Sequence, residues 1–441
     1  MTDRPSAFLP QDADSAANAA LTPLASSMER SKILHIAGQV RGMLANGVDV
    51  CNLTVGDFSP AEFPVPQALI DRTITEFQAG QTNYPPAAGI PELRSALADY
   101  YERVFGIDFG ANGVVVGAGA RPVLYASYRL FLEPGDGFAH GVPAWNNHYY
   151  VHLNQSKAFP LQGNPESRFL PTVEQIVEVL PEIRLLGLNS PLNPTGTAYR
   201  SDELQAICEA VLAENRKRES RGQRPVILIY DQVYWTIMAP GFTHTHPLQL
   251  VPELAPYVIS IDAISKSLAA TGLRLGWAVA PPHLTAPMIA LVGHMGAWPA
   301  RPIQRAAAWL YSEGTDVLDQ HYATMGTAVQ ERLSCLVRAL EGMRADGLPV
   351  DLVAPEGGIY LTVRFDLFGR RTPNGEVLNS NEAIRTYLLN AAQVAVVPFQ
   401  AFGLATDNGW FRMSVGAVDT DALDAAMTRL ARSISQLTTT V

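Results

Sequence analysis

Cysteine is scarce in this sequence, and long apolar runs and clusters of basic residues are absent. The three cysteines, Cys51, Cys208 and Cys335, lie far apart, which fits neither a disulfide framework nor a metal cluster. No stretch reaches the length of apolar sequence that a membrane helix requires. Acidic residues outnumber basic residues by 42 to 32. We therefore expect neither nucleic acid nor a membrane as a partner, since anionic partners need clustered Lys and Arg.

The N-terminus also lacks the cationic start and apolar core of a signal peptide, so we expect a cytoplasmic protein. The chain has 441 residues, of which 47% are hydrophobic and 17% are charged, as is typical of globular proteins. This length exceeds what one simple core accommodates, which predicts two domains. Residues 1–27 are rich in Ala, Ser and Asp and lack periodicity, so we expect them to form a mobile extension.

Apolar runs of strand length alternate with helical patterns in the middle of the chain. The predicted strands are Gly113–Val116, Leu185–Leu188, Val226–Tyr230, Val258–Ile261 and Gly276–Ala280. Strands separated by helices indicate an α/β fold with a mostly parallel sheet that is covered on both faces. In such sheets the ligand lies outside the C-terminal ends of the strands, so the residues that follow each strand are the candidates for a site.

The pattern changes near Gly326 to a long helix over Thr327–Arg344, then short strands and a last helix over Thr420–Ile434. An earlier helical pattern covers Met28–Asn46. We expect a smaller α+β domain made of residues 28–65 and 325–441. The large domain would then consist of residues 66–324.

Small residues follow the first predicted strand. Gly119-Ala120-Arg121 precedes a helical stretch over Val123–Leu132. Small residues between a strand and a helix let backbone N–H groups reach a phosphate at the helix N-terminus. A plain tight turn is the alternative, because the spacing of dinucleotide-binding glycines is absent.

Polar residues follow the next two strands. Asn193 precedes Pro194, which favours an extended backbone that can point the amide into a cleft towards a phenolic oxygen. A simple turn is the alternative. Asp231 ends a buried strand, where a carboxylate is costly without a partner such as a protonated pyridine nitrogen. A helix cap or a structural salt bridge would also satisfy it.

Lys266 follows the fourth strand, and Arg274 comes eight residues later. A lysine at the mouth of a sheet, desolvated and near a cation, has a lowered pKa and becomes nucleophilic. The planar fork of Arg274 suits a phosphate monoester. For these two residues alone, an exposed surface pair is the alternative.

In order and spacing, these clusters resemble the class I/II aminotransferases of the aspartate aminotransferase superfamily, which are fold type I enzymes dependent on pyridoxal 5′-phosphate (PLP). The resemblance covers nearly everything from residue 30 to 435. It also includes the segments Asn52–Gly56, Asn83–Gly89, Glu133–Asp136 and Phe411–Ser414. The family implies a large domain with a mostly parallel sheet, a smaller α+β domain and a homodimer with active sites at the subunit interface.

The resemblance implies a role for each matching residue. Lys266 would form the Schiff base with PLP and move the α-proton, while Asp231 would pair with the pyridine nitrogen, supported from behind by His148. Tyr84 would reach the cofactor of the neighbouring subunit. Further cofactor contacts are implied for Gly119, Ala120, Arg121, Trp145, Asn193, Tyr234, Ser265 and Arg274. Substrate contacts are implied for Gly56, Arg121, Trp145, Asn193 and Arg412, and no metal is expected.

Two departures from the family pattern concern the cavity wall. Ala263 stands where a serine often donates to the phosphate. Phe399 and Gln400 follow Pro398 where a glycine is common, which reshapes the wall near the substrate.

Three functions remain open on the sequence. The first is transamination between an amino acid and a 2-oxo acid, with Arg121 as a bidentate partner for the distal carboxylate of an aspartate-like or glutamate-like substrate. The second is another PLP reaction on the same fold, such as β- or γ-elimination, decarboxylation or oxidation. The third is a regulatory protein that has kept the fold without catalysis.

Overall fold

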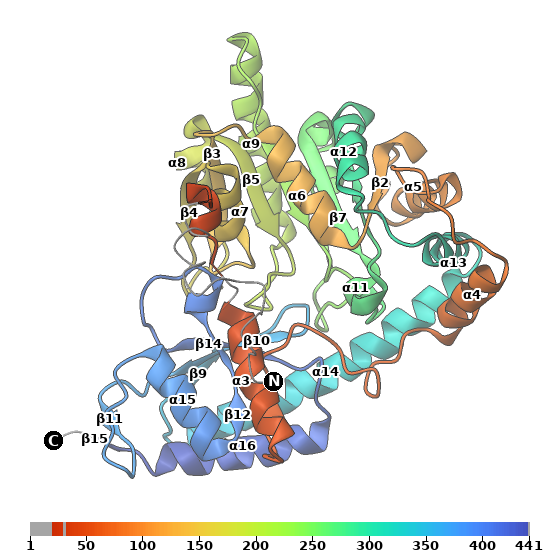
Figure 1. Cartoon of the computed structure of the whole chain (residues 1–441). Helices are drawn as coiled ribbons and strands as arrows, with labels where there is room; N and C mark the ends of the chain where they lie inside the picture. Colours follow the sequence, from red (N-terminus) through yellow and green to blue (C-terminus); the bar gives the residue numbers. More distant parts are fainter. Residues whose placement is uncertain (1–19, 30–31, 440–441) are drawn as a thin grey trace.

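The structure of the chain is a computed structural model that describes residues 20–29 and 32–439 (Figure 1). The α-helices are α2 (Pro23–Ser26), α3 (Lys32–Ala45), α4 (Gln67–Gln78), α5 (Pro91–Phe105), α6 (Ala120–Phe131), α7 (Asn147–Asn154), α8 (Val173–Val179), α9 (Ser201–Ser220), α10 (Pro247–Leu250), α11 (Ile264–Ser267), α12 (Pro282–Met295), α13 (Arg301–Ser312), α14 (Thr315–Ala345), α15 (Asn381–Ala392) and α16 (Thr420–Ser435). Short 3₁₀ turns are η1 (Ala111–Gly113), η2 (Leu180–Glu182), η3 (Pro252–Tyr257), η4 (Thr271–Leu273) and η5 (Phe399–Phe402).

A seven-stranded sheet forms the centre of the upper part of the molecule in Figure 1. Its strands, in spatial order, are β2 (Val114–Gly117), β8 (Gly276–Val279), β7 (Val258–Ala263), β6 (Ile227–Asp231), β5 (Ile183–Asn189), β3 (Gly137–Val142) and β4 (Lys157–Gln162). Only β8 runs antiparallel to its neighbours. The expected α/β fold with a mostly parallel central sheet is confirmed.

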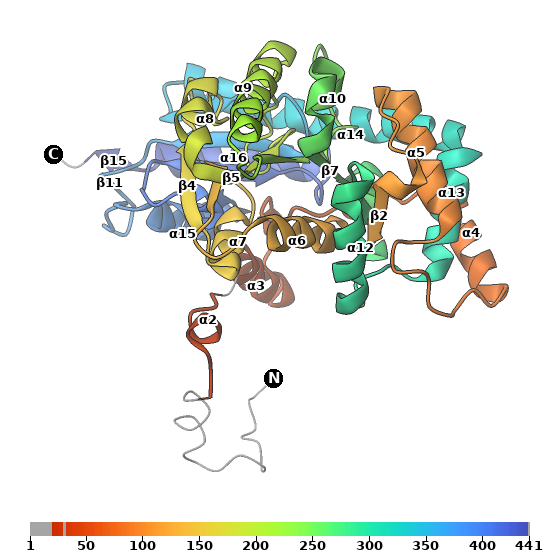
Figure 2. The same cartoon turned by 90° about the horizontal axis from the view of Figure 1, so that it is seen from above.

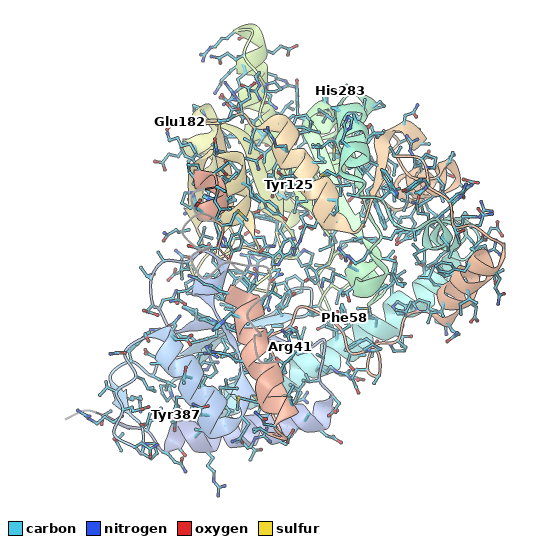
Figure 3. All side chains as sticks on the ribbon, viewed as in Figure 1. Arg41, Phe58, Tyr125, Glu182, His283 and Tyr387 are labelled. Carbon is cyan, nitrogen blue, oxygen red and sulfur yellow. The ribbon has the colours of Figure 1, made fainter. Side chains whose placement is uncertain are left out.

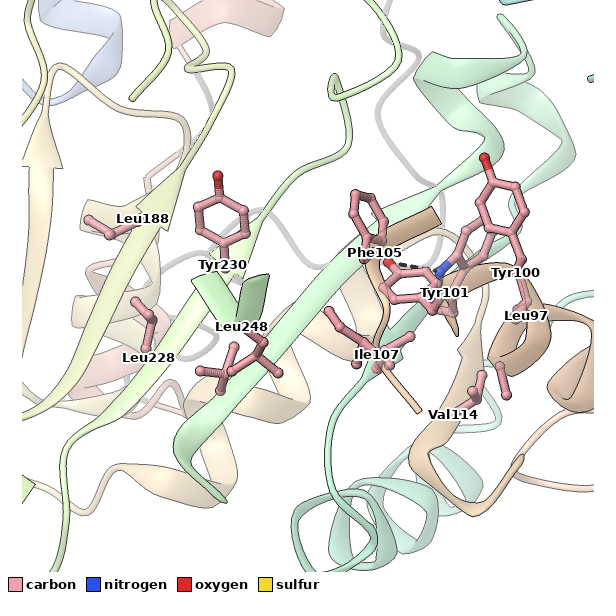
Figure 4. Packing of buried hydrophobic residues seen from close by; sticks show 14 of the residues in the cluster. Leu97, Tyr100, Tyr101, Phe105, Ile107, Val114, Leu188, Leu228, Tyr230 and Leu248 are labelled. Atoms are coloured by element: carbon pink, nitrogen blue, oxygen red, sulfur yellow. Dashed lines mark hydrogen bonds between the residues drawn. The ribbon is translucent and has the colours of Figure 1, made fainter. Parts of the chain in front are cut away.

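Apart from the largely exposed edge strand β4, both faces of this sheet are buried, which explains why most of its strands are continuous apolar runs rather than alternating ones. Along β2, Val114 and Val116 face one core while Val115 faces the other. The first core contains α5, α8, α9, α10 and α13, and Figure 4 shows part of its packing. The second core contains α6, α7 and α12. Seen from above in Figure 2, these two sets of helices lie on opposite sides of the sheet.

A smaller antiparallel sheet lies below the large one in Figure 1. Its strands, in spatial order, are β13 (Val397–Pro398), β14 (Trp410–Ser414), β10 (Tyr360–Phe365) and β9 (Val350–Val353). Two short pairs accompany it, β1 (Cys51–Asn52) with β12 (Val394–Ala395) and β11 (Arg370–Arg371) with β15 (Thr438–Thr439). Helices α14, α15 and α16 pack against this sheet in a third core. Phe58, labelled in Figure 3, belongs to that core and lies between the two parts of the molecule.

One helix is much longer than expected. The helix predicted from Thr327 is the C-terminal part of α14, which begins at Thr315 and runs for 31 residues. The prediction treated Gly326 as a break. A Cβ at that position would meet nothing within 4 Å, so the glycine sits on an open helix face and does not interrupt the helix.

The pairing of β1 with β12 joins residues 51–52 to residues 394–395, as a domain composed of both chain ends requires. The domain bounds themselves, 28–65 with 325–441 and 66–324, stay a prediction.

Of the expected N-terminal extension, residues 1–19 lie outside the described residues, and residues 23–26 form α2. Within residues 20–29 and 32–439, no helix is long and apolar enough to cross a membrane.

A buried glutamate joins the loop after β5 to the segment that leads into β10. Glu356 is 3% exposed, and its carboxylate accepts from the Ala198 N–H at 2.8 Å. It also pairs with Arg168 at 3.0 Å. The loop after β5 carries Asn193 and β10 begins with Tyr360, so the hydrogen bond from Ala198 to Glu356 joins two walls of the space between the sheets.

We predict that Glu356→Ala lowers the free energy of unfolding by about 2 kcal/mol, because it removes the acceptor of a buried backbone N–H and one of the two carboxylates that pair with Arg168, which keeps Glu203. Denaturant unfolding measures the loss. The matched control is Asp351→Ala, which breaks an ion pair to Arg344 whose partners are 52% and 54% exposed. That change should cost less than about 1 kcal/mol. Equal losses for the two variants would contradict the proposed importance of Glu356.

Candidate active site

A cavity of about 460 Å³ lies between the C-terminal ends of the large sheet's parallel strands and the smaller sheet. Segments far apart in the sequence meet there, from the loop after β1 to strand β14. Of the predicted site residues, the cavity is lined by Gly56, Ala120, Arg121, Trp145, Asn193, Asp231, Tyr234, Ser265, Lys266, Arg274 and Arg412.

Lys266 lies in the short helix α11, directly after β7, and its Nζ donates a hydrogen bond to the carbonyl of Gly56. Burial lowers the pKa of this amine to about 8, and the positive charges of Arg412 and Arg274 act in the same direction. Asp57 and Asp231 oppose the shift. A substantial fraction of the amine is therefore unprotonated near neutral pH and able to act as a nucleophile or base.

Asp231 ends β6 on the floor of the cavity. Burial raises the pKa of its carboxyl to about 6, while the N–H of Val233, 3.2 Å from Oδ1, and the charge of Lys266 lower it. The carboxylate forms no ion pair within 4 Å among the described residues. A positively charged ligand group placed against it would supply the partner that a buried carboxylate needs.

Two asparagines connect Asp231 to the opposite wall. Asn189 donates from Nδ2 to the backbone carbonyl of Asp231 at 2.9 Å and accepts the N–H of Asn193 on its Oδ1 at 2.9 Å. Arg412 in turn donates to Oδ1 of Asn193 at 2.9 Å. The amide group of Asn193 is thereby fixed with its Nδ2 available as a donor.

Arg412 is 1% exposed and has no carboxylate partner in the part of the chain that the structure describes. Its guanidinium lies 4.6 Å from the ring centroid of Tyr360 and 4.8 Å from that of Phe402, and it donates to the carbonyl of Thr54. Among the described residues, its Nε has no hydrogen-bond partner. A buried arginine held by aromatic rings and carbonyls, without a counter-ion, is suited to bind the carboxylate of a ligand.

An anion cup forms where α6 begins. Arg274 donates to the carbonyls of Thr271 at 2.8 Å and Ala118 at 3.2 Å, which positions its guanidinium over Gly119. Gly119 has φ of +89°, and a Cβ there would lie 2.2 Å from the Arg274 guanidinium. The guanidinium and the N-terminus of α6 together supply the charge and N–H donors that a phosphate needs.

The outer wall of the cavity combines a cation with an aromatic ring. The guanidinium of Arg121 lies 4.8 Å from the ring centroid of Trp145, a cation–π arrangement. This contact holds Arg121, the second residue of α6, beside the cavity.

Three predicted residues are not part of the cavity lining. Gly119 lies behind Arg274. Tyr84 is 85% exposed and contacts Trp298, so it does not reach the cavity of its own chain. His148 packs against Tyr149 with ring centroids 4.0 Å apart, and no hydrogen bond joins it to Asp231 among the described residues.

Sequence reasoning missed several residues of the site. Tyr360 shares a 2.6 Å hydrogen bond with Tyr234, and a Cβ at Gly56 would lie 2.4 Å from the Tyr360 hydroxyl oxygen. Gly56 is therefore required for close approach, and the adjacent Asp57 accepts from the Thr271 hydroxyl at 2.5 Å. The only sequence signals were the Gly357-Gly358 pair before β10 and the acidic residue next to Gly56.

Comparisons with known proteins agree with this geometry. The family model for aminotransferase class I and II matches residues 48–430. The chain is a class I/II aminotransferase. An aspartate aminotransferase of Geobacillus stearothermophilus is 30% identical over 92% of this chain and 96% of that protein. The crystal structure of the aspartate aminotransferase from Rhizobium meliloti superposes with a TM-score of 0.84 at 28% identity, covering 95% of this chain and 99% of that one.

A probable aspartate/prephenate aminotransferase of Rhizobium leguminosarum is 28% identical over 92% of this chain and 96% of that protein. These relatives confirm the expected aminotransferase and do not favour the alternative of another PLP reaction. The family is known to depend on PLP.

We predict that Lys266 of the ligand-free aminotransferase is methylated by formaldehyde and cyanoborohydride with a half-maximal rate near pH 8. The neutral amine reacts, and burial makes it available below the ordinary lysine pKa of about 10.4. Mass spectrometry of the Lys266 peptide at a series of pH values gives the profile, with the exposed Lys157 as an internal standard for the reagent. A midpoint above pH 10 would contradict the lowered pKa.

Proposed function

We propose that this aminotransferase binds PLP in the cavity through Lys266 and moves an amino group between a dicarboxylic amino acid, such as aspartate or glutamate, and a 2-oxo acid. The observation that carries the proposal is the meeting of three groups in one cavity. The amine of Lys266 has a lowered pKa, the partly buried carboxylate of Asp231 has no cation within ion-pair distance among the described residues, and the buried guanidinium of Arg412 has no anion there.

The residues present fit the cofactor. The cup of Arg274 and the N-terminus of α6 suits a phosphate monoester, although Ala263 offers no hydroxyl there. Asp231 suits a protonated ring nitrogen, and the free Nδ2 of Asn193 with the Tyr234 hydroxyl suits a phenolic oxygen. Trp145 would cover one face of the ring. When bound, PLP supplies an electron-accepting pyridinium ring that stabilises the carbanion formed at the substrate's α-carbon.

Three side chains of the protein would then have separate roles in the reaction. Lys266 would hold the cofactor through its amine, and as a free amine it would move the α-proton of the substrate, first as base and then as acid. Asp231 would pair with the ring nitrogen and favour its protonated form. Arg412 holds the substrate's α-carboxylate through two N–H groups, and the bond from its guanidinium to Asn193 fixes its orientation.

The proposal of a dicarboxylic substrate rests on the position of Arg121. Its guanidinium is held on the outer wall by Trp145, with no carboxylate within ion-pair distance among the described residues. The relatives' names, aspartate and aspartate/prephenate aminotransferase, support an acidic substrate. We also propose that the enzyme is a homodimer in which the exposed Tyr84 reaches the partner's cavity. We further propose that the enzyme is cytoplasmic.

The experiment that tests the cofactor assignment is borohydride reduction of the protein with added PLP, followed by peptide mapping. We predict a phosphopyridoxyl group on the peptide that contains Lys266, and reversible changes in visible absorbance when amino acids and then 2-oxo acids are added. Lys266→Ala should abolish the label and the absorbance band while the protein stays folded. A label on another lysine, or an unchanged band in Lys266→Ala, would refute the assignment.

Substrate class is tested separately. Arg121→Ala should lower kcat/KM for aspartate by about 10- to 100-fold, because a charge-assisted hydrogen bond to the distal carboxylate is lost, and should affect alanine little. Arg121→Lys keeps the charge without the planar fork, so we expect an intermediate loss. Equal losses for aspartate and alanine would show that Arg121 serves the cofactor or the fold instead.

A further inference from the structure

A second, small cavity of about 20 Å³ lies beside Asp231, and Asp231 lines both this space and the large cavity. Its polar lining comes from Tyr128 on α6, Asn147 on α7 and Asn189 at the end of β5. The volume is enough for one water molecule, and the lining provides the polar partners that a buried water requires.

The hydrogen bonds around this small cavity leave the side-chain amide donors of Asn147 unused. Both polar atoms of the Asn189 amide are engaged by the backbone of Asp231 and Asn193. Asn147 accepts the hydroxyl of Tyr128 on its Oδ1 at 3.0 Å, which directs its Nδ2 the other way. No hydrogen bond from that Nδ2 is recorded within residues 20–29 and 32–439, so Asn147 offers a free N–H donor in a space shared with Asp231.

Asp231 needs such a donor. An ionised carboxylate only accepts, with about four lone-pair positions. From the main chain it receives one N–H bond, from Val233 at 3.2 Å. The ionisable groups whose charges interact with it are Lys266, Asp262, Tyr128, Tyr150 and Tyr234. Of these, only Lys266 contributes a positive charge that favours the ionised form.

We propose that Asn147, oriented by Tyr128, is the positioning residue for Asp231 and acts through one water molecule held in the small cavity. The proposal rests on the proposed function, in which Asp231 pairs with the ring nitrogen of PLP. Family resemblance assigned this support to His148. Successive residues of a helix point about 100° apart, and α7 turns Asn147 to the cavity while the His148 ring packs against Tyr149.

The test is Asn147→Leu, which keeps the approximate shape and removes the donor. Dissociation constants for PLP are measured by absorbance on the full-length ligand-free protein from about pH 5 to 9, where Asp231 changes its charge. Without the donor the pKa of Asp231 rises, so the affinity for PLP should be lost at a pH about one unit higher. At about pH 6 the dissociation constant should rise roughly fivefold, because a one-unit rise of the pKa lowers the ionised fraction of Asp231 from about a half to about a tenth. Tyr128→Phe, which releases Asn147, should give a smaller shift in the same direction.

His148→Ala is the matched comparison at the neighbouring position. A shift in His148→Ala with none in Asn147→Leu would overturn the inference and restore the role that the family resemblance implied. An unchanged profile in Asn147→Leu would also overturn it. Wild-type protein that does not bind PLP at all would instead refute the proposed function, which separates the two failures.

A purely structural role for Asn147 would lower stability without moving the pH profile, so thermal unfolding and circular dichroism are recorded for each variant. If Asn147→Leu does not fold, the profile of Tyr128→Phe decides together with a crystal structure of the wild-type holoenzyme. The proposal expects a water molecule within hydrogen-bond distance of Asn147 Nδ2 and the Asp231 carboxylate. An empty cavity there would overturn it.

Discussion

Lys266, Asp231 and Arg412 lose most of their hydration in one cavity without forming ion pairs with one another. Each is held by neutral partners instead, the carbonyl of Gly56 for the lysine, the Val233 N–H for the aspartate, and Asn193 with the Thr54 carbonyl for the arginine. Direct pairing would leave no free charge for a ligand. Everything else in the site serves to keep these charges apart and uncompensated, which prepares them for charged groups that arrive later.

The fold provides this separation because two sheets contribute to one space. The ends of β5, β6 and β7 carry Asn193, Asp231 and Lys266, while the smaller sheet contributes Tyr360 and Arg412. Glycines allow the close approaches, as at Gly56 against the Tyr360 hydroxyl. A rigid parallel sheet with both faces buried fixes the first set, and the buried Glu356 ties the loop after β5 to the segment before β10.

Five of the seven strands of the large sheet were predictable from the sequence as continuous apolar runs, and so were the residues that follow them, such as Asp231 and Lys266. The strands β3 and β4 were not predicted, because Gly, His, Lys and Gln interrupt their apolar pattern. Tyr360 was not predicted either, because an aromatic residue starting a strand is indistinguishable from a core residue until the other sheet is in place. Which residue of a helix faces the site is equally hard to predict from the sequence. Asn147 and His148 are neighbours in a polar stretch, and only the packing of α7 against α6 determines which one faces Asp231.

The separated charges also make the ligand-free enzyme less stable than its fold would allow. A lysine whose pKa falls to about 8 binds its proton less tightly than the unfolded chain does, so its penalty is complete below pH 8. An aspartate whose pKa rises to about 6 carries its full penalty above pH 6. At about 1.4 kcal/mol per pKa unit, each shift corresponds to a few kcal/mol of stability. Between pH 6 and 8 both penalties act together, and a ligand that supplies a cation to Asp231 and bonds the neutral amine of Lys266 removes both. Binding of such a ligand and stability would thereby be coupled by the same two residues.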